Sequence, residues 1–109
     1  MEELIAKLST IVPTYPFEGA QGVKAPYATY ELTEMPIRTK DGIVGSEGTL
    51  TLSVYAPSLR ATQELADAIV SAIDSKRFGN RKVYYADAEN SDYPDVGLSS
   101  KTLTFNTLS

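Results

Sequence analysis

The residue types that most often carry enzyme chemistry are missing from this chain of 109 residues. It contains no histidine and no cysteine. It therefore lacks the usual general base near neutral pH, and Ser-His and Cys-His nucleophile pairs cannot form. Zinc sites of the common types lose both of their preferred ligands. Carboxylate, lysine and tyrosine chemistry remain, and we expect a protein that is not an enzyme and holds no cofactor or metal.

The strongest candidate for carboxylate chemistry is an acidic segment near the C-terminal end. Its four acids fall close together in the sequence: Asp87, Glu89, Asp92 and Asp95. Such oxygens suit a hard divalent cation, although their spacing does not match an EF-hand loop. We favour a solvated loop, Glu89 to Gly97, between two strands. A cation site and an acidic rim past which DNA slides remain alternative interpretations.

Composition narrows the classes of partner. The formal net charge is −4, whereas proteins that bind nucleic acid by neutralising phosphates are basic. No apolar run approaches the roughly 20 residues that span a bilayer, and the first residues are acidic, unlike a signal peptide. The sequence predicts a single domain over residues 1–109, in the cytoplasm or in a particle assembled there, with no specific nucleic-acid or membrane binding.

Hydrophobic periodicity predicts two helices and four strands that must position these groups. The expected helices are Glu2–Thr10 and a longer one from an N-cap at Ser58 to about Lys76, with Gly79 following it. The expected strands are Ala25–Glu34, Thr49–Ala56, Arg81–Ala88 and Leu98–Leu108. The order α-β-β-α-β-β predicts an α+β fold, a two-layer sandwich with a four-stranded, mainly antiparallel sheet and both helices on one face.

The segment Met35–Gly48 is too long for a tight turn and predicts a hairpin that extends past the sheet. Asp41 and Gly42 are typical of a turn at its tip. The candidate contact residues of this hairpin are Arg38, Lys40, Asp41, Ile43 and Val44. Apolar residues at a loop tip have no core to join, so they fold back on the sheet or dock on a neighbour. We favour docking.

Tyrosine is the most abundant aromatic residue, with seven in the chain. Tyr27, Tyr55 and Tyr84 fall on the expected outer face of the sheet. Tyrosine is enriched at protein interfaces because it buries a ring and keeps a polar tip. It is also a good strand residue, so an interface role and a purely structural role both remain open.

Four segments, taken in order, carry a family resemblance: Val12–Pro16, Ala25–Tyr30, Leu52–Pro57 and Glu64–Ile69. They read VPTYP, APYATY, LSVYAP and ELADAI. Together they resemble the tail completion proteins of long-tailed bacteriophages, also called tail terminators or head-to-tail joining proteins. The resemblance spans about Leu4 to Ile73.

This resemblance implies a structural protein of a virion tail, assembled in the cytoplasm of a bacterial host. Its partners would be further copies of itself in a ring, with six as the expected number, the tail tube protein and the head connector protein. The outer sheet face and the hairpin would be the contact surfaces. A stand-alone α+β module that binds a small ligand or peptide is the main alternative, and a carboxylate enzyme built on Asp87, Glu89 and Asp92 is a third.

Overall fold

A computed structural model describes residues 2–16, 25–93 and 98–109, without the side chains of residues 43, 44 and 91–93. Two helices and six strands follow one another along the chain. They are α1 (Glu2–Ser9), β1 (Thr14–Pro16), β2 (Tyr27–Thr39), β3 (Gly42–Ala56), α2 (Leu59–Ile73), β4 (Lys76–Phe78), β5 (Arg81–Tyr93) and β6 (Leu98–Leu108).

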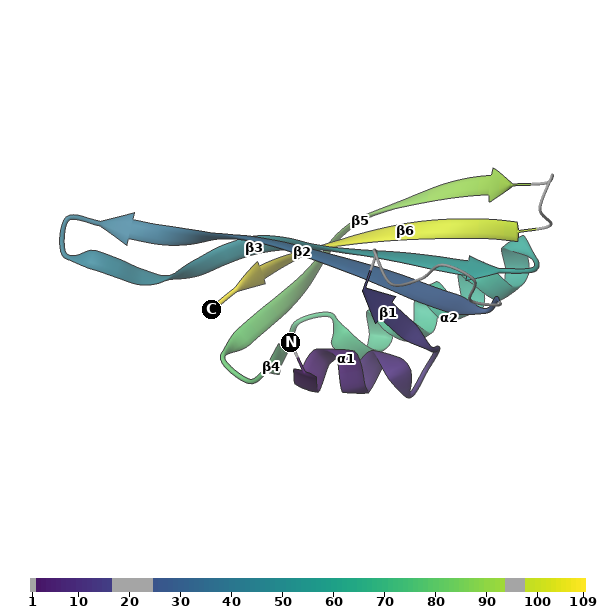
Figure 1. The fold of residues 1–109 in the computed structure, drawn as a ribbon, viewed down its shortest axis with the longest axis horizontal. Coiled ribbons are helices and arrows are strands. Elements are labelled where there is room, and N and C mark those ends of the chain that lie inside the picture. Colours follow the sequence, from purple (N-terminus) through teal and green to yellow (C-terminus); the bar gives the residue numbers. More distant parts are fainter. Residues whose placement is uncertain (1, 17–24, 94–97) are drawn as a thin grey trace.

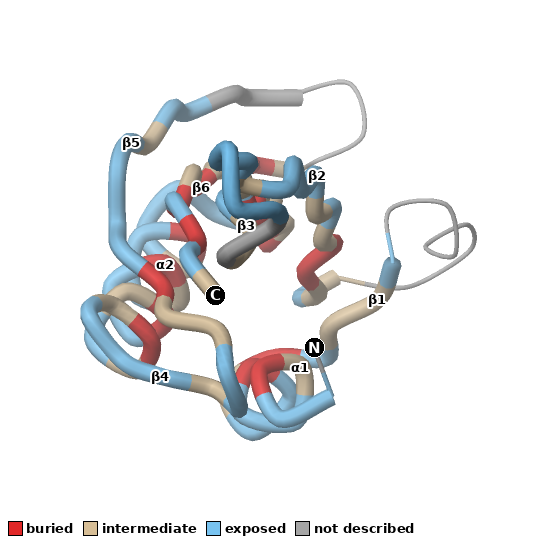
Figure 2. The backbone as a smooth tube through the Cα atoms, turned by 90° about the vertical axis from the view of Figure 1, so that its left-hand side faces the viewer, coloured by how far each residue is buried: buried red, intermediate tan, exposed pale blue. Residues whose placement is uncertain are grey.

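The strands form one six-stranded mixed sheet in the order β1-β2-β3-β6-β5-β4. β1 runs parallel to β2, and the other neighbours are antiparallel. The sheet curls into a half-barrel, and Figure 2 shows the strands arching from β1 to β4 with both helices inside or below the arch. The predicted four-stranded, mainly antiparallel two-layer sandwich is therefore wrong. The two missed strands have three residues each, too few to show an alternating pattern.

The long helix α2 begins as the sequence predicts. The Ser58 side chain caps it by accepting a hydrogen bond from the Ala61 N–H at 3.1 Å. The helix ends at Ile73, earlier than predicted, because Asp74 adopts an extended conformation. Gly79 is therefore not the residue that follows the helix; it lies in the turn between β4 and β5 with a φ of 65°. Glycine adopts this left-handed conformation without a steric penalty.

The core lies between the concave face of the sheet and the two helices. It contains one face each of β3, α2 and β6. The fully buried large side chains include Leu50, Leu52, Val54, Ile69, Ile73, Leu103 and Phe105, joined by Leu4 and Leu8 from α1. Burying each such side chain contributes roughly 1.5–3 kcal/mol before conformational entropy is counted.

β5 is longer than predicted and continues through Tyr93. The segment from Glu89 to Tyr93 is thus a strand that pairs with β6, and the predicted loop over it is wrong. Its remaining residues, including Asp95, lie outside the described part of the chain. Within the described ranges, no helix has the length and apolar character needed to cross a membrane.

Candidate assembly surface

The most prominent surface feature is a two-stranded arm, residues 36–46, made by the far ends of β2 and β3. β6 accompanies β3 only as far as the Glu47–Leu108 pair. The backbones of Ser46 and Ser109 then exchange hydrogen bonds of 3.0 and 2.8 Å. Beyond this point β2 and β3 pair only with each other, and Figure 1 shows the arm projecting away from the helices. The arm lies along the long axis of a molecule that measures 53 by 23 by 22 Å (Figure 1).

The tip of the arm has the tight turn that its sequence predicts. β2 ends at Thr39 and β3 begins at Gly42, whose φ is 114°. The Thr39 hydroxyl accepts a hydrogen bond from the Asp41 N–H at 3.2 Å and donates one to the Gly42 carbonyl at 3.3 Å. These local bonds hold the turn without help from the rest of the molecule.

The arm has no core beneath it. Among its residues with described side chains none is buried, and Arg38, Lys40 and Asp41 are exposed. Ile43 and Val44 lie in β3, where Ile43 is the register partner of Arg38 and Val44 is the unpaired residue of a β-bulge. The side chains of both residues lie outside the description, so their role in docking stays a prediction.

The other predicted contact residues lie away from the arm. Tyr27 and Tyr55 are register partners at the opposite end of β2 and β3, and their rings stack with centroids 4.8 Å apart. Burial raises the pKa of the Tyr27 phenol above its usual value of 10.0, and the charge on the neighbouring Tyr55 phenolate raises it further. Tyr84 lies on β5 with the Lys82 ammonium 5.3 Å from its ring centre. The structure therefore joins two of the three tyrosines and leaves the third separate.

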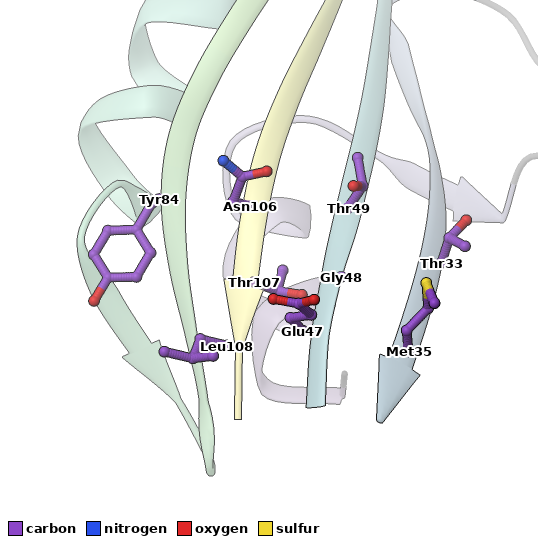
Figure 3. A pocket seen from close by; sticks show the side chains of 9 residues that line it. All are labelled: Thr33, Met35, Glu47, Gly48, Thr49, Tyr84, Asn106, Thr107 and Leu108. Atoms are coloured by element: carbon purple, nitrogen blue, oxygen red, sulfur yellow. The ribbon is translucent and has the colours of Figure 1, made fainter. Parts of the chain in front are cut away.

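A shallow groove of about 490 Å³ crosses the outer face of the sheet at the base of the arm. The outer face is the one turned away from the helices. Figure 3 shows the lining side chains, which come from β2, β3, β6 and β5. Three large apolar side chains of this groove are among the most exposed in the molecule: Met35, Tyr84 and Leu108.

Of these three residues the sequence predicted only Tyr84 as a contact residue, and not Met35 or Leu108. A usable signal was present, because Met35 shares the parity of the outward residues of its strand, and side chains alternate between the two faces. What the sequence could not show was the register. The pairs Met35–Glu47 and Glu47–Leu108 place three residues from distant parts of the chain in one row.

An ion pair on the concave side was also missed. The Arg81 guanidinium, on β5, donates to the Glu34 carboxylate, on β2, at 2.7 Å. The two strands are not neighbours in the sheet, so the pair ties together the two sides of the curl. The Arg81 side chain is 13% exposed, and its Nε has no hydrogen-bond partner.

The acidic segment offers little for a cation in the described part of the chain. No group of three or more acidic, histidine or cysteine side chains there is placed to hold a metal ion. Asp87 instead accepts a hydrogen bond from the Ala88 N–H at 2.8 Å. Because side chains alternate along a strand, Asp87 and Glu89 point to the same side of β5 and do not fold around a centre.

No protein-family model matches the chain, and none of the curated proteins matches it. Its fold does match a solved structure, a chain described as "Virion of native gene transfer agent (GTA) particle". The TM-score is 0.70, and the match covers 96% of this chain and 82% of that one. Sequence identity is 15%, so the likeness establishes a shared fold. The half-barrel with its two helices is thus an architecture found in a virion component.

Proposed function

We propose that this chain is a structural protein of a phage or prophage particle that forms a ring, caps the tail tube and joins it to the head connector. The observation that carries the proposal is the match to a chain of a virion over 96% of the molecule.

The tail-capping role is the finer part of the proposal and rests on the sequence resemblance. The segments that carry the resemblance contain the stacked Tyr27 and Tyr55, and Ile69 of α2, which is part of the core. Two features support assembly: an arm with exposed polar and charged residues, and a groove at the arm's base with three exposed large apolar side chains. Exposed apolar side chains that lie close together on a surface are typical of protein–protein contact sites.

In a ring, one surface of each copy contacts a different surface of the next copy. Such a heterologous contact, repeated around a rotation axis, closes into a ring. The arm lies at one end of the long axis and the β5–β6 end of the sheet at the other (Figure 1). A net charge of −4 suits a ring through which DNA passes without sticking.

Native mass by light scattering over a concentration series, with negative-stain images of each fraction, tests this function. The expected result is closed rings, either alone or after addition of tail tube protein. A monomer at every concentration, with no ring nucleated by tail tube protein, would overturn the proposal. That outcome would favour the alternative of a stand-alone module that binds a small ligand or peptide.

A further inference from the structure

A second hollow, here called the basic groove, lies on the helix side of the molecule between α1, α2 and β4. Its volume is about 600 Å³. Half-buried apolar side chains line it, among them Ile11, Ala72 and Phe78. Three exposed cations complete the lining: Lys7, Lys76 and Arg77. No acidic residue lines it.

These cations have no acidic partner within the described chain. The ion pairs found there are Arg60–Glu64 and Arg81–Glu34, neither of which involves the groove. Lys76 donates only a long hydrogen bond of 3.5 Å to the Ser71 carbonyl. A concentration of unpaired positive charge over an apolar floor is unusual for a chain of net charge −4. It suits an acidic occupant with an apolar component.

The same chain carries a matching acidic surface on β5. Asp87 and Glu89 are both exposed, and neither forms an ion pair with a described residue. They are two residues apart on a strand, so they point to the same side with Cα atoms roughly 6.7 Å apart. We call these two residues the acidic ridge.

The ridge lies on a strand edge that can make side-chain contacts but is poorly suited to strand addition. β4 pairs with β5 only as far as Val83, so the edge is free beyond that point. However, the Tyr85 N–H donates to the Asp74 carboxylate and the Ala88 N–H to the Asp87 carboxylate, each at 2.8 Å. Capped edge donors of this kind oppose pairing with another strand.

We propose that the acidic ridge of one copy docks in the basic groove of the next copy. This inference rests on the self-assembly in the proposed function and names the two surfaces that meet. A copy cannot fill its own groove, because the second half of β5 runs away from β4 and α1 (Figure 1). The contact joins two different surfaces, so it propagates around an axis as a ring requires.

Charge favours a protein occupant over DNA. The groove offers three cations and an apolar floor in a chain of net charge −4, whereas proteins that bind DNA through phosphate neutralisation are strongly basic, with clustered Lys and Arg. Two carboxylates on a strand match three cations more closely. Complementary charges of this kind also fix which surfaces meet and in which register.

Charge reversal in two complementary variants tests the contact. The base-reversed variant carries Lys76→Glu and Arg77→Glu, and the acid-reversed variant carries Asp87→Lys and Glu89→Lys. Each variant alone presents like charges on both surfaces, so we expect its self-association to weaken by on the order of 100-fold. An equimolar mixture restores opposite charges at every contact, and we expect it to form alternating rings. Sedimentation velocity and negative-stain images measure both results.

Arg60→Glu and Glu64→Lys are the matched controls, because these side chains are 90% and 68% exposed on α2 outside the groove. Both controls are expected to assemble like the unmodified chain. Far-ultraviolet circular dichroism checks folding, and Glu89→Lys alone replaces the acid-reversed variant if loss of the Asp87 hydrogen bond unfolds it. Reversed variants that form rings by themselves, or a mixture that remains monomeric, would overturn the docking contact.

These outcomes separate the contact from the proposed function. If the unmodified chain forms rings and the reversed variants do too, the ring function stands and the contact falls. If the unmodified chain associates without forming rings even with tail tube protein, the function falls, and the contact stands only if each reversed variant loses that association and the mixture regains it; an unmodified chain that does not associate at all overturns both. Retardation of a DNA fragment that the base-reversed variant alone loses would assign the groove to nucleic acid instead.

Discussion

β2 and β3 each have two parts: one lies in the six-stranded sheet above the core, and the other forms the arm, which has no core beneath it. Between Ala28 and Leu32 on β2 and between Leu50 and Ala56 on β3, the inward side chains belong to the core and are buried or half-buried. Past Met35 and Glu47 the same strands continue without a helix, and their side chains become exposed. Backbone pairing alone is thus enough to extend the two strands into the arm. Burial decides which part of them stabilises the fold, and the exposed part stays available for contacts with other proteins.

The largest effect on stability is expected where burial is complete. Ile69→Asp places an unpaired charge beneath the sheet, at a residue that is 0% exposed. Because an isolated buried carboxylate is costly, we expect the domain to unfold, a loss well above the 2–5 kcal/mol of Ile→Ala. Leu59→Asp is the control, since Leu59 lies on the same helix but is 59% exposed. A cooperative thermal melt of Ile69→Asp would contradict the buried position of this face.

A smaller loss is expected where β2 and β3 begin to separate from the core. A Cβ on Gly48 would collide with the Thr33 carbonyl oxygen and approach the Thr107 Oγ1 to 2.9 Å. Gly48→Ala should therefore cost about 1–3 kcal/mol, because backbone must move to admit the methyl group. Urea denaturation measures the difference, and an unchanged midpoint would show that the two strands are not this close.

The ion pair across the curl should contribute less than a core residue but more than a surface pair. Glu34→Gln leaves the largely buried Arg81 guanidinium without its anion, and we expect a loss of about 1–3 kcal/mol. Glu64→Gln removes an exposed pair with Arg60 at 3.2 Å and should change stability by no more than about 0.5 kcal/mol. If the two substitutions lower the free energy of unfolding equally in urea denaturation, the Arg81–Glu34 pair is as solvent-exposed as the Arg60–Glu64 pair.

The stacked tyrosines give a stability effect that depends on pH. The pKa of Tyr27 is raised in the folded chain, so above pH 10.0 the unfolded chain loses this phenol proton while the folded chain keeps it. Stability is then expected to fall as pH rises from 10.0 to the folded pKa, and to be unaffected below that window. Tyr27→Phe should flatten this part of the urea-midpoint profile, and an unchanged slope would contradict the pKa assignment.

The arm should tolerate change without loss of the fold. Ile43→Asp and Val44→Asp are expected to shift the free energy of unfolding by less than about 0.5 kcal/mol, because no helix packs beneath this part of β3. The same substitutions are expected to abolish ring formation, as measured by light scattering. Leu59→Asp adds the same charge at a residue that is 59% exposed on α2, outside the arm, and serves as the control. Normal rings from both Asp variants would remove the arm from the contact.

Local chemistry explains which parts of the fold could be predicted. Ser58 caps α2 because its hydroxyl can reach the Ala61 N–H, an interaction within one turn. The turn at Asp41 and Gly42 is equally local. The strand Thr49–Ala56 could be predicted because apolar residues alternate along it, and in the structure its apolar side is buried.

The errors arose where the deciding partner is distant in sequence. Thr14–Pro16 is a strand because it pairs with the edge of β2, and Lys76–Phe78 is a strand because it pairs with β5. The ladder that extends β5 to Tyr93 is supplied by β6. The outer groove likewise needs a register that brings Met35, Glu47 and Leu108 into one row.

The sequence by itself determined which residues leave water, where α2 begins, where the hairpin turns, and that histidine and cysteine chemistry are absent. The tertiary structure decided that the sheet has six mixed strands, that it curls, and that basic and acidic residues gather on separate surfaces. The reason is physical. Caps, turns and periodicity act between residues a few positions apart, whereas strand order, curl and charge patches depend on contacts whose energy is realised only after the chain has closed on itself.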